Sequence, residues 1–240
     1  FRREVGRLAG QYVKNEYYPE GDAPKKSVDV EIAIELKEQN AAFKVEKYLH
    51  TYPNCWRTDK PILYYPMDSW FIKVSAIRDR LTALNKKINW KPKETGEKRF
   101  GNWLANANDW NLSRSRFWGI PLPIWRSEDG KKEIIIGSVE ELFDEVENSI
   151  KKGIMVSNPL IDFKVGEMSD TNYEKIDLHK DFVDEIVLSS KDGTPLYREK
   201  EIIDVWFDSG AMPYAQWHYP FENKDKIEMG TAFPADYIAE

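Results

Sequence analysis

The chain has 240 residues, of which 41% are hydrophobic, 13% are aromatic and 32% are charged, and its formal net charge is -6. The interleaved charges argue against a disordered chain, the net acidity argues against a globally basic nucleic-acid binder, and no apolar run approaches the roughly 18 residues of a membrane span. The single cysteine, Cys55, excludes an intrachain disulfide and a four-cysteine zinc site and fits a reducing cytosol. We therefore expect a cytoplasmic globular protein without a membrane partner, of one large or two modest domains.

The N-terminal part of the chain predicts two amphipathic helices joined by an irregular segment. Ser27 can cap a helix over residues 28–40, where apolar residues recur at steps of four. Prolines make residues 48–65 a loop that leads into a short strand or extended segment. A longer helix is predicted over residues 70–88, because apolar residues recur there at steps of three and four.

Basic residues gather at and beyond the end of this longer helix. They are Lys86, Lys87, Lys91, Lys93, Lys98 and Arg99. Two interpretations stay open, since such a run is usually a solvated face but also suits contact with phosphate.

Short elements are predicted in the middle of the chain. We expect a helix over residues 97–106, a helical turn over 112–116 and a strand over 131–137. Ser138 and Glu141 have the spacing of a capping box, which opens an amphipathic helix ending near residue 150.

The following residues, 153–200, are polar and weakly periodic, which indicates a small inserted α+β module. It contains a helix predicted over residues 178–186, capped by Asp177, and a hairpin turn at Asp192 and Gly193. Residues 202–207 then predict a buried strand that ends at Asp208. Ligands bind outside the carboxyl ends of strands in open α/β sheets, so this strand end is a candidate binding site.

Residues 102–125 hold four of the nine tryptophans, around a Ser-Arg-Ser-Arg step and a Gly-Ile-Pro-Leu-Pro turn. Tryptophan supplies a rigid apolar face and arginine a planar fork of donors, which suits a wall for a planar or anionic ligand. The alternative is a buried aromatic cluster with arginine stems packed on the rings. No phosphate loop, dinucleotide fingerprint, zinc helix or serine nucleophile elbow is present, and no histidine is nominated as a catalyst.

In a series of short sequence motifs, or phrases, the chain resembles the isoleucyl-tRNA synthetases, a branch of the class I aminoacyl-tRNA synthetases. These phrases are AGQYVKNEYY (9–18), FKVEKYLH (43–50), CWRTDKP (55–61), SWFI (69–72), NWL (102–104), DWNLSRSRFWGIPLPIW (109–125), DLH (177–179) and DVWFDSG (204–210). Single phrases recur in the valine and leucine enzymes, whereas the complete ordered series indicates the isoleucine branch.

The resemblance implies an α/β fold that comprises parts of a split Rossmann-like catalytic domain and a small α+β insertion. Residues 1–50 would be the exit of the editing insertion, and 51–128 a return linker, helices and a catalytic-core segment. Residues 129–200 would form the small insertion, and 201–240 the re-entry into the core. Both chain ends look like cuts through a larger protein, and the family's HIGH and KMSKS signatures and editing pocket are absent. We therefore expect an internal fragment, inactive alone.

The implied parent enzyme is a monomer that activates isoleucine with ATP and Mg²⁺ and transfers it to tRNA(Ile). Trp206 matches the family tryptophan that packs against the isoleucine side chain, and Glu240 matches the glutamate that opens an adenylate-binding stretch. Further candidates for the cleft wall or for tRNA contacts are Arg114, Arg116, Trp118, Gly119 and Asp208. No acid or base is expected from this chain, because activation depends on positioning and charge stabilisation.

Many family members carry half of a zinc site, Cys-x-x-Cys, at the CWR phrase, but here Thr58 takes the second position. A threonine hydroxyl is a poor zinc ligand. We therefore expect no zinc at Cys55 and a lone buried cysteine instead. A second hypothesis for the whole chain is a stand-alone tRNA-binding or editing module, which its net acidity and missing editing pocket disfavour.

Overall fold

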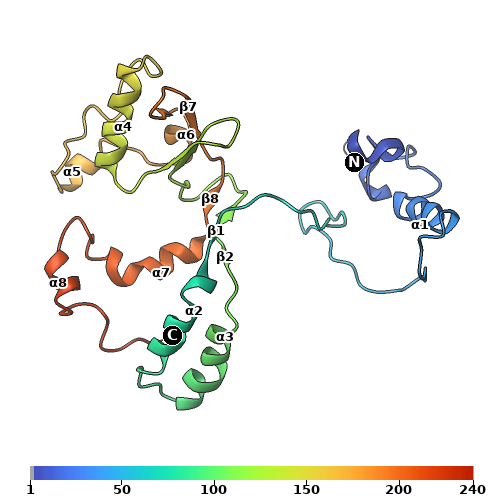
Figure 1. Ribbon diagram of the computed structural model, residues 1–240, viewed down its shortest axis with the longest axis horizontal. Coiled ribbons are helices and arrows are strands. Elements are labelled where there is room, and N and C mark those ends of the chain that lie inside the picture. The colour runs from blue at the N-terminus through green and yellow to red at the C-terminus, as the bar shows by residue number, and fades with distance from the viewer. Residues whose placement is uncertain (1–2, 240) are drawn as a thin grey trace. The chain divides into compact units, whose positions relative to one another are not determined.

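The computed structural model describes residues 3–239 (Figure 1). The chain divides between Met67 and Asp68 into two compact units. Across the described residues, no helix combines the length and the apolar character needed to cross a membrane.

The first unit contains the 3₁₀ helices η1 (Arg3–Leu8) and η2 (Asn15–Tyr17) and the helix α1 (Val28–Glu38). The predicted helix over residues 28–40 is confirmed, although the Ser27 side chain makes no capping hydrogen bond. The predicted loop over residues 48–65 is also confirmed, with an isolated bridge between Asn54 and Pro61.

The second unit begins with β1 (Phe71–Ile72), the 3₁₀ turn η3 (Val74–Ala76) and the helix α2 (Arg78–Asn85). The single helix predicted over residues 70–88 is therefore wrong in its first half. β1 pairs antiparallel with β2 (Trp110–Asn111), and the backbone N–H of Trp70 donates to Ser113 Oγ. These long-range hydrogen bonds override the helical periodicity, which is only a weak local preference.

A π-helical turn, η4 (Thr95–Phe100), runs directly into α3 (Gly101–Ala105), and α2 and α3 pack against each other. The helix predicted over residues 97–106 is confirmed. The helical turn predicted over residues 112–116 is wrong, because β3 (Ser113–Arg114) pairs antiparallel with β8 (Ile202–Ile203).

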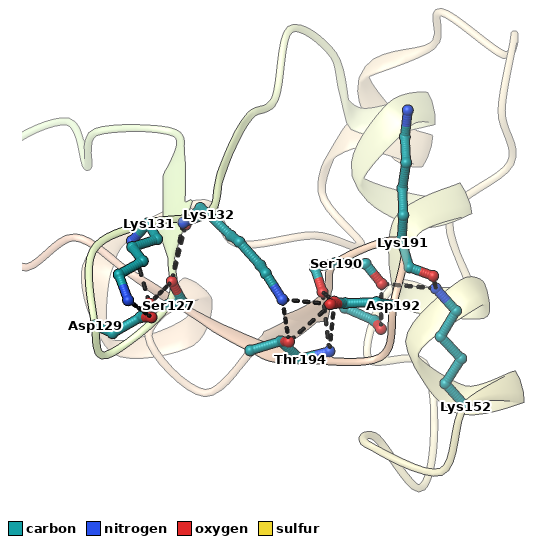
Figure 2. A network of polar contacts seen from close by, with 10 residues as sticks. Ser127, Asp129, Lys131, Lys132, Lys152, Ser190, Lys191, Asp192 and Thr194 are labelled. Carbon is teal, nitrogen blue, oxygen red and sulfur yellow. Dashed lines mark hydrogen bonds and ion pairs between the residues drawn. The ribbon is translucent and has the colours of Figure 1, made fainter.

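Between β3 and β8 lies a four-stranded antiparallel sheet in the order β5-β4-β7-β6. Its strands are β4 (Ile124–Arg126), β5 (Glu133–Ile135), β6 (Val187–Ser189) and β7 (Pro195–Arg198). The strand predicted over residues 131–137 and the predicted hairpin turn at Asp192 and Gly193 are both confirmed. Lys132 joins the two hairpin turns, since its Nζ donates to Asp192 Oδ2 at 2.5 Å and to Thr194 Oγ1 at 2.7 Å (Figure 2).

The helix α4 (Val139–Lys151) packs on β6 and begins at the predicted capping box. Ser138 Oγ accepts from the N–H of Glu141 at 3.0 Å, and the Glu141 carboxylate accepts from the N–H of Gly137 at 2.7 Å. Two short helices follow, α5 (Asp170–Tyr173) and α6 (Lys180–Val183). The helix predicted over residues 178–186 is thus shorter than expected, and its N-cap residue is His179 rather than Asp177.

The hydrophobic core of this unit lies between α4 and the sheet. Trp125 is 2% exposed and donates its indole N–H to the carbonyl of Ile186 at 2.8 Å. The other buried members are Ile136, Leu142, Val146, Leu160, Ile186, Leu188 and Leu196.

A buried arginine holds together the two chain segments that enter and leave the sheet. The side chain of Arg198 is 1% exposed and forms an ion pair with Asp184. Its Nη1 also donates to the carbonyls of Leu122 and Glu201. A buried guanidinium needs such partners, because an unpaired buried charge is costly.

The last elements are α7 (Val205–Ala215) and α8 (Lys224–Glu228). The buried strand predicted over residues 202–207 is wrong beyond Ile203. The Asp204 side chain accepts from the N–H of Trp206 and caps α7, so that Trp206 and Asp208 lie on a helix.

We predict that Val146→Ala lowers the free energy of local unfolding of the four-stranded sheet by about 2 kcal/mol, because it removes buried methyl groups and leaves a cavity. Val146 is 0% exposed, whereas Val156 is 98% exposed, so Val156→Ala is the matched control and should have almost no effect. Amide hydrogen exchange in β4, β6 and β7 measures both changes. Equal protection in the two variants would contradict this assignment of the core.

Candidate functional site

The candidate site is the first turn of α7, at the point where the chain returns from the small sheet. The backbone N–H of Asp204 donates to the carbonyl of Leu112 at 2.8 Å, and that of Ile203 donates to the carbonyl of Ile120 at 2.7 Å. The start of α7 is therefore bound to residues 112–120, which belong to the tryptophan-rich run.

The carboxylate of Asp204 connects three parts of this site. Asp204 is 5% exposed. Its Oδ2 accepts from Arg114 Nη2 at 2.5 Å and from the indole N–H of Trp110 at 3.1 Å. Its Oδ1 accepts from the backbone N–H of Trp206 at 3.3 Å. One buried carboxylate thus joins β2, β3 and α7.

Opposing influences act on the ionisation of Asp204. Burial is the largest and favours the neutral acid, but the hydrogen bonds from Trp110 and Trp206 and the positive charge of Arg114 outweigh it. Together they hold the pKa of Asp204 below its ordinary value. The ionised form is therefore the one that the folded site stabilises.

Arg114 is brought to this site but is engaged in supporting it. Its Nη1 donates to the carbonyls of Asn111 and Ser113, in addition to the ion pair with Asp204. These bonds give the guanidinium a structural role. Arg116, two residues further on, is exposed.

Trp206 is 69% exposed and presents a rigid apolar ring at the surface of the first turn of α7. Asp208 lies half-buried in the same turn. The ring of Phe207 lies near β2, with its centroid 6.3 Å from that of Trp110. The first turn of α7 thus combines a buried anchor with an exposed apolar face.

Trp118 and Gly119 lie on the segment that follows β3. Trp118 is 65% exposed, and its ring stacks on that of His179 with centroids 4.6 Å apart and planes 19° apart. Gly119 has φ +149°, and a Cβ placed there would lie 2.4 Å from Ile202 Cδ1. Only glycine permits this close approach to the strand that leads into α7. Glu240, the remaining predicted contact, lies outside the described residues.

The tryptophan-rich run is divided between buried and exposed positions, and its role as a ligand wall stays a prediction. Trp125 is a core residue and Trp110 supports Asp204, whereas Trp103 and Trp118 are more than 60% exposed. The residues that sequence reasoning missed are Asp204 and Trp110. An aspartate directly before a helix is an N-cap signal, but it became visible only once α7 replaced the predicted strand.

Cys55 lies in a tight turn of the first unit. It is half-exposed, so the expectation of a buried cysteine is wrong. A hydrogen bond with the side chain of Thr58 lowers the pKa of the Cys55 thiol. Within residues 3–239, no three His, Cys, Asp or Glu side chains form a group that could hold a metal ion.

We predict that Asp204→Asn reduces stability most strongly near neutral pH. Because the pKa of Asp204 is lowered on folding, its contribution is present above the unfolded value of about 4 and is lost as the pH falls through the folded value. The difference in unfolding free energy between wild type and variant should therefore shrink below about pH 4. Urea unfolding between pH 7 and pH 3 measures it, with Asp181→Asn at an exposed carboxylate as the control. A difference that grows on acidification would refute this role.

Comparison with known proteins identifies the family. A family model described as tRNA synthetases class I (I, L, M and V) matches residues 22–240. The chain is 59% identical over 232 residues to the isoleucine–tRNA ligase of Porphyromonas gingivalis. This alignment covers 97% of the chain and 20% of that protein. For the isoleucine–tRNA ligase of Cytophaga hutchinsonii, the identity is 56% over 250 residues, covering 100% of the chain and 21% of that protein.

The isoleucine–tRNA ligase of Clostridium acetobutylicum is 44% identical over 216 residues, covering 90% of the chain and 18% of that protein. The chain thus spans about a fifth of the length of the curated relatives it matches. The resemblance to the isoleucine branch is confirmed, and the chain belongs to the class I tRNA synthetase family of the isoleucine, leucine, methionine and valine enzymes.

Proposed function

We propose that this chain is part of an isoleucine–tRNA ligase, which acts as a monomer in the cytoplasm and joins isoleucine to tRNA(Ile) at the expense of ATP. The observation that carries the proposal is the 59% identity to such a ligase across 97% of the chain. In this proposal, residues 51–128 form a return linker, helices and a segment of a split Rossmann-like catalytic domain, residues 129–200 form a small insertion, and residues 201–240 re-enter the catalytic domain. Residues 1–50 are the exit of an editing insertion.

The reaction proceeds in two group transfers. The carboxylate of isoleucine attacks the α-phosphorus of ATP, which forms isoleucyl-adenylate and releases pyrophosphate. A ribose hydroxyl of the terminal adenosine of tRNA then attacks the activated carbonyl and displaces AMP. Positioning of anions and stabilisation of developing charge dominate such steps.

Within this reaction, the proposed role of Trp206 is to pack against the isoleucine side chain. Its indole is exposed, apolar and held at the start of a helix whose cap, Asp204, is itself buried and bonded. A preorganised apolar wall of this kind discriminates between side chains, and one methylene is worth about 1–3 kcal/mol in such a site. We propose that the substrate cleft is bordered by further residues, which are Arg116, Trp118, Gly119 and Asp208. We propose that Glu240 contacts the adenylate.

Mg²⁺ accompanies ATP in the proposed reaction. The roles that we propose for the described residues are binding and positioning of the substrates.

The test is ATP–pyrophosphate exchange across a panel of amino acids with the full-length protein. Isoleucine should support the fastest exchange, and Trp206→Ala should lower kcat/KM for isoleucine by roughly 10- to 200-fold, because the apolar wall is lost. Trp56→Ala, which removes an 86% exposed tryptophan from the first unit, is the control and should leave exchange unchanged. Exchange with valine or leucine that equals or exceeds the exchange with isoleucine would contradict the proposed substrate. Wild-type kinetics in Trp206→Ala would contradict the role of Trp206.

We also propose that the turn at Cys55 holds no zinc. Cys55 is followed by Thr58, whose hydroxyl hydrogen-bonds the thiol and is a weak ligand for zinc. Elemental analysis of the full-length protein and of its Cys55→Ser variant should give equal zinc contents. A loss of one zinc per chain in Cys55→Ser would overturn this proposal.

A further inference from the structure

Residues 78–99 comprise α2, the loop after it and most of η4, and are called here the basic lobe. The basic lobe has a charge opposite to that of the chain as a whole. It holds eight basic and three acidic residues, a net charge of +5, in a chain whose net charge is -6. Its basic residues are Arg78, Arg80, Lys86, Lys87, Lys91, Lys93, Lys98 and Arg99. The remainder of the chain is therefore strongly acidic, and the positive charge is concentrated in one place.

Buried contacts give the basic lobe a defined shape. Asn85, at the end of α2, is 7% exposed, and its Nδ2 donates to the carbonyl of Gly96 at 2.9 Å. Its Oδ1 accepts from the indole N–H of Trp90 at 2.9 Å. A Cβ on Gly96 would lie 2.0 Å from the Trp90 ring, so this approach requires glycine. The lysines between α2 and η4 are thus carried on a fixed chain reversal. Figure 1 shows the chain turning back between α2 and α3.

The cations of the basic lobe are almost all uncompensated. Lys86, Lys87, Lys91, Lys98 and Arg99 are exposed. Of the basic side chains in this lobe, only Lys93 has an ion pair among the described residues, with Glu97 at 3.0 Å. Like charges held together without counterions repel each other, so the folded lobe maintains a positive potential.

Three lysines in and beside the four-stranded sheet differ in this respect, as Figure 2 shows. Lys131 pairs with Asp129, Lys132 pairs with Asp192, and Lys152 donates to the carbonyl of Ser190. The ammonium groups of Lys132 and Lys152 thus connect separate segments of the protein. Apart from Lys93, the basic side chains of the lobe have no such partner among the described residues, which favours an external one.

We propose that the basic lobe binds the phosphate backbone of the tRNA. This inference rests on the proposed function, because it assigns a docking surface to the RNA substrate of that reaction. Phosphate contacts by lysine and arginine supply affinity and orientation without reading sequence. A local positive surface is needed here, since the acidic remainder of the chain repels a polyanion.

The experiment measures binding of tRNA(Ile) to the full-length protein as a function of salt concentration. Lys86→Gln with Lys87→Gln should raise Kd roughly tenfold at physiological salt, and should reduce the salt slope by about 0.7 to 0.9 for each lost phosphate contact. The control is Lys175→Gln with Lys191→Gln, which removes two exposed lysines of the small insertion and should leave Kd and slope unchanged. Thermal unfolding checks that all variants are folded.

Replacement of Lys86 and Lys87 by arginine distinguishes charge from structure. The arginine variant should bind tRNA as wild type does, and a loss equal to that of the glutamine variant would overturn the inference. An unchanged Kd and slope in the glutamine variant would overturn it as well, and so would an equal loss in the control variant. Isoleucine-dependent exchange by the wild-type protein involves no RNA, so its presence or absence tests the proposed function separately.

Discussion

The buried carboxylate of Asp204 is the interaction on which the candidate site depends. It caps α7 and also accepts from the side chains of Arg114 and Trp110, so helix formation and strand association share one anion. Such a carboxylate is stable in the interior only when all its partners are present. The exposed ring of Trp206 is therefore positioned by residues more than 90 positions away in the sequence.

A second buried charge lies at the entrance of the small sheet. Arg198 connects Asp184 with the two chain segments at Leu122 and Glu201. Gly119 then allows the incoming segment to contact Ile202 closely, just before Asp204. The small sheet and the candidate site are thus joined by a short series of buried polar bonds and one close backbone approach. These contacts hold the two segments in a fixed register.

The charge distribution separates the roles of the basic residues. Arg114, Lys132 and Arg198 have internal partners and serve the fold. The basic lobe instead keeps its cations exposed on a rigid reversal. The same residue types therefore act as internal supports in one part of the unit and as a candidate RNA surface in another. Local geometry, rather than net charge, makes this distinction.

Local sequence signals were sufficient where an element depends on its own residues. The helix after Ser138, the hairpin at Asp192 and the family itself could all be predicted from the sequence. Long-range contacts decided the rest. The predicted helix from Trp70 was interrupted because Trp70 bonds across to Ser113, and the predicted strand through Trp206 became helix because Asp204 is held by Arg114 and Trp110. The sequence alone thus determined the family and the self-contained elements. Tertiary structure decided where Trp206 and Asp204 lie, because hydrogen bonds between distant segments outweigh the weak preferences of neighbouring residues.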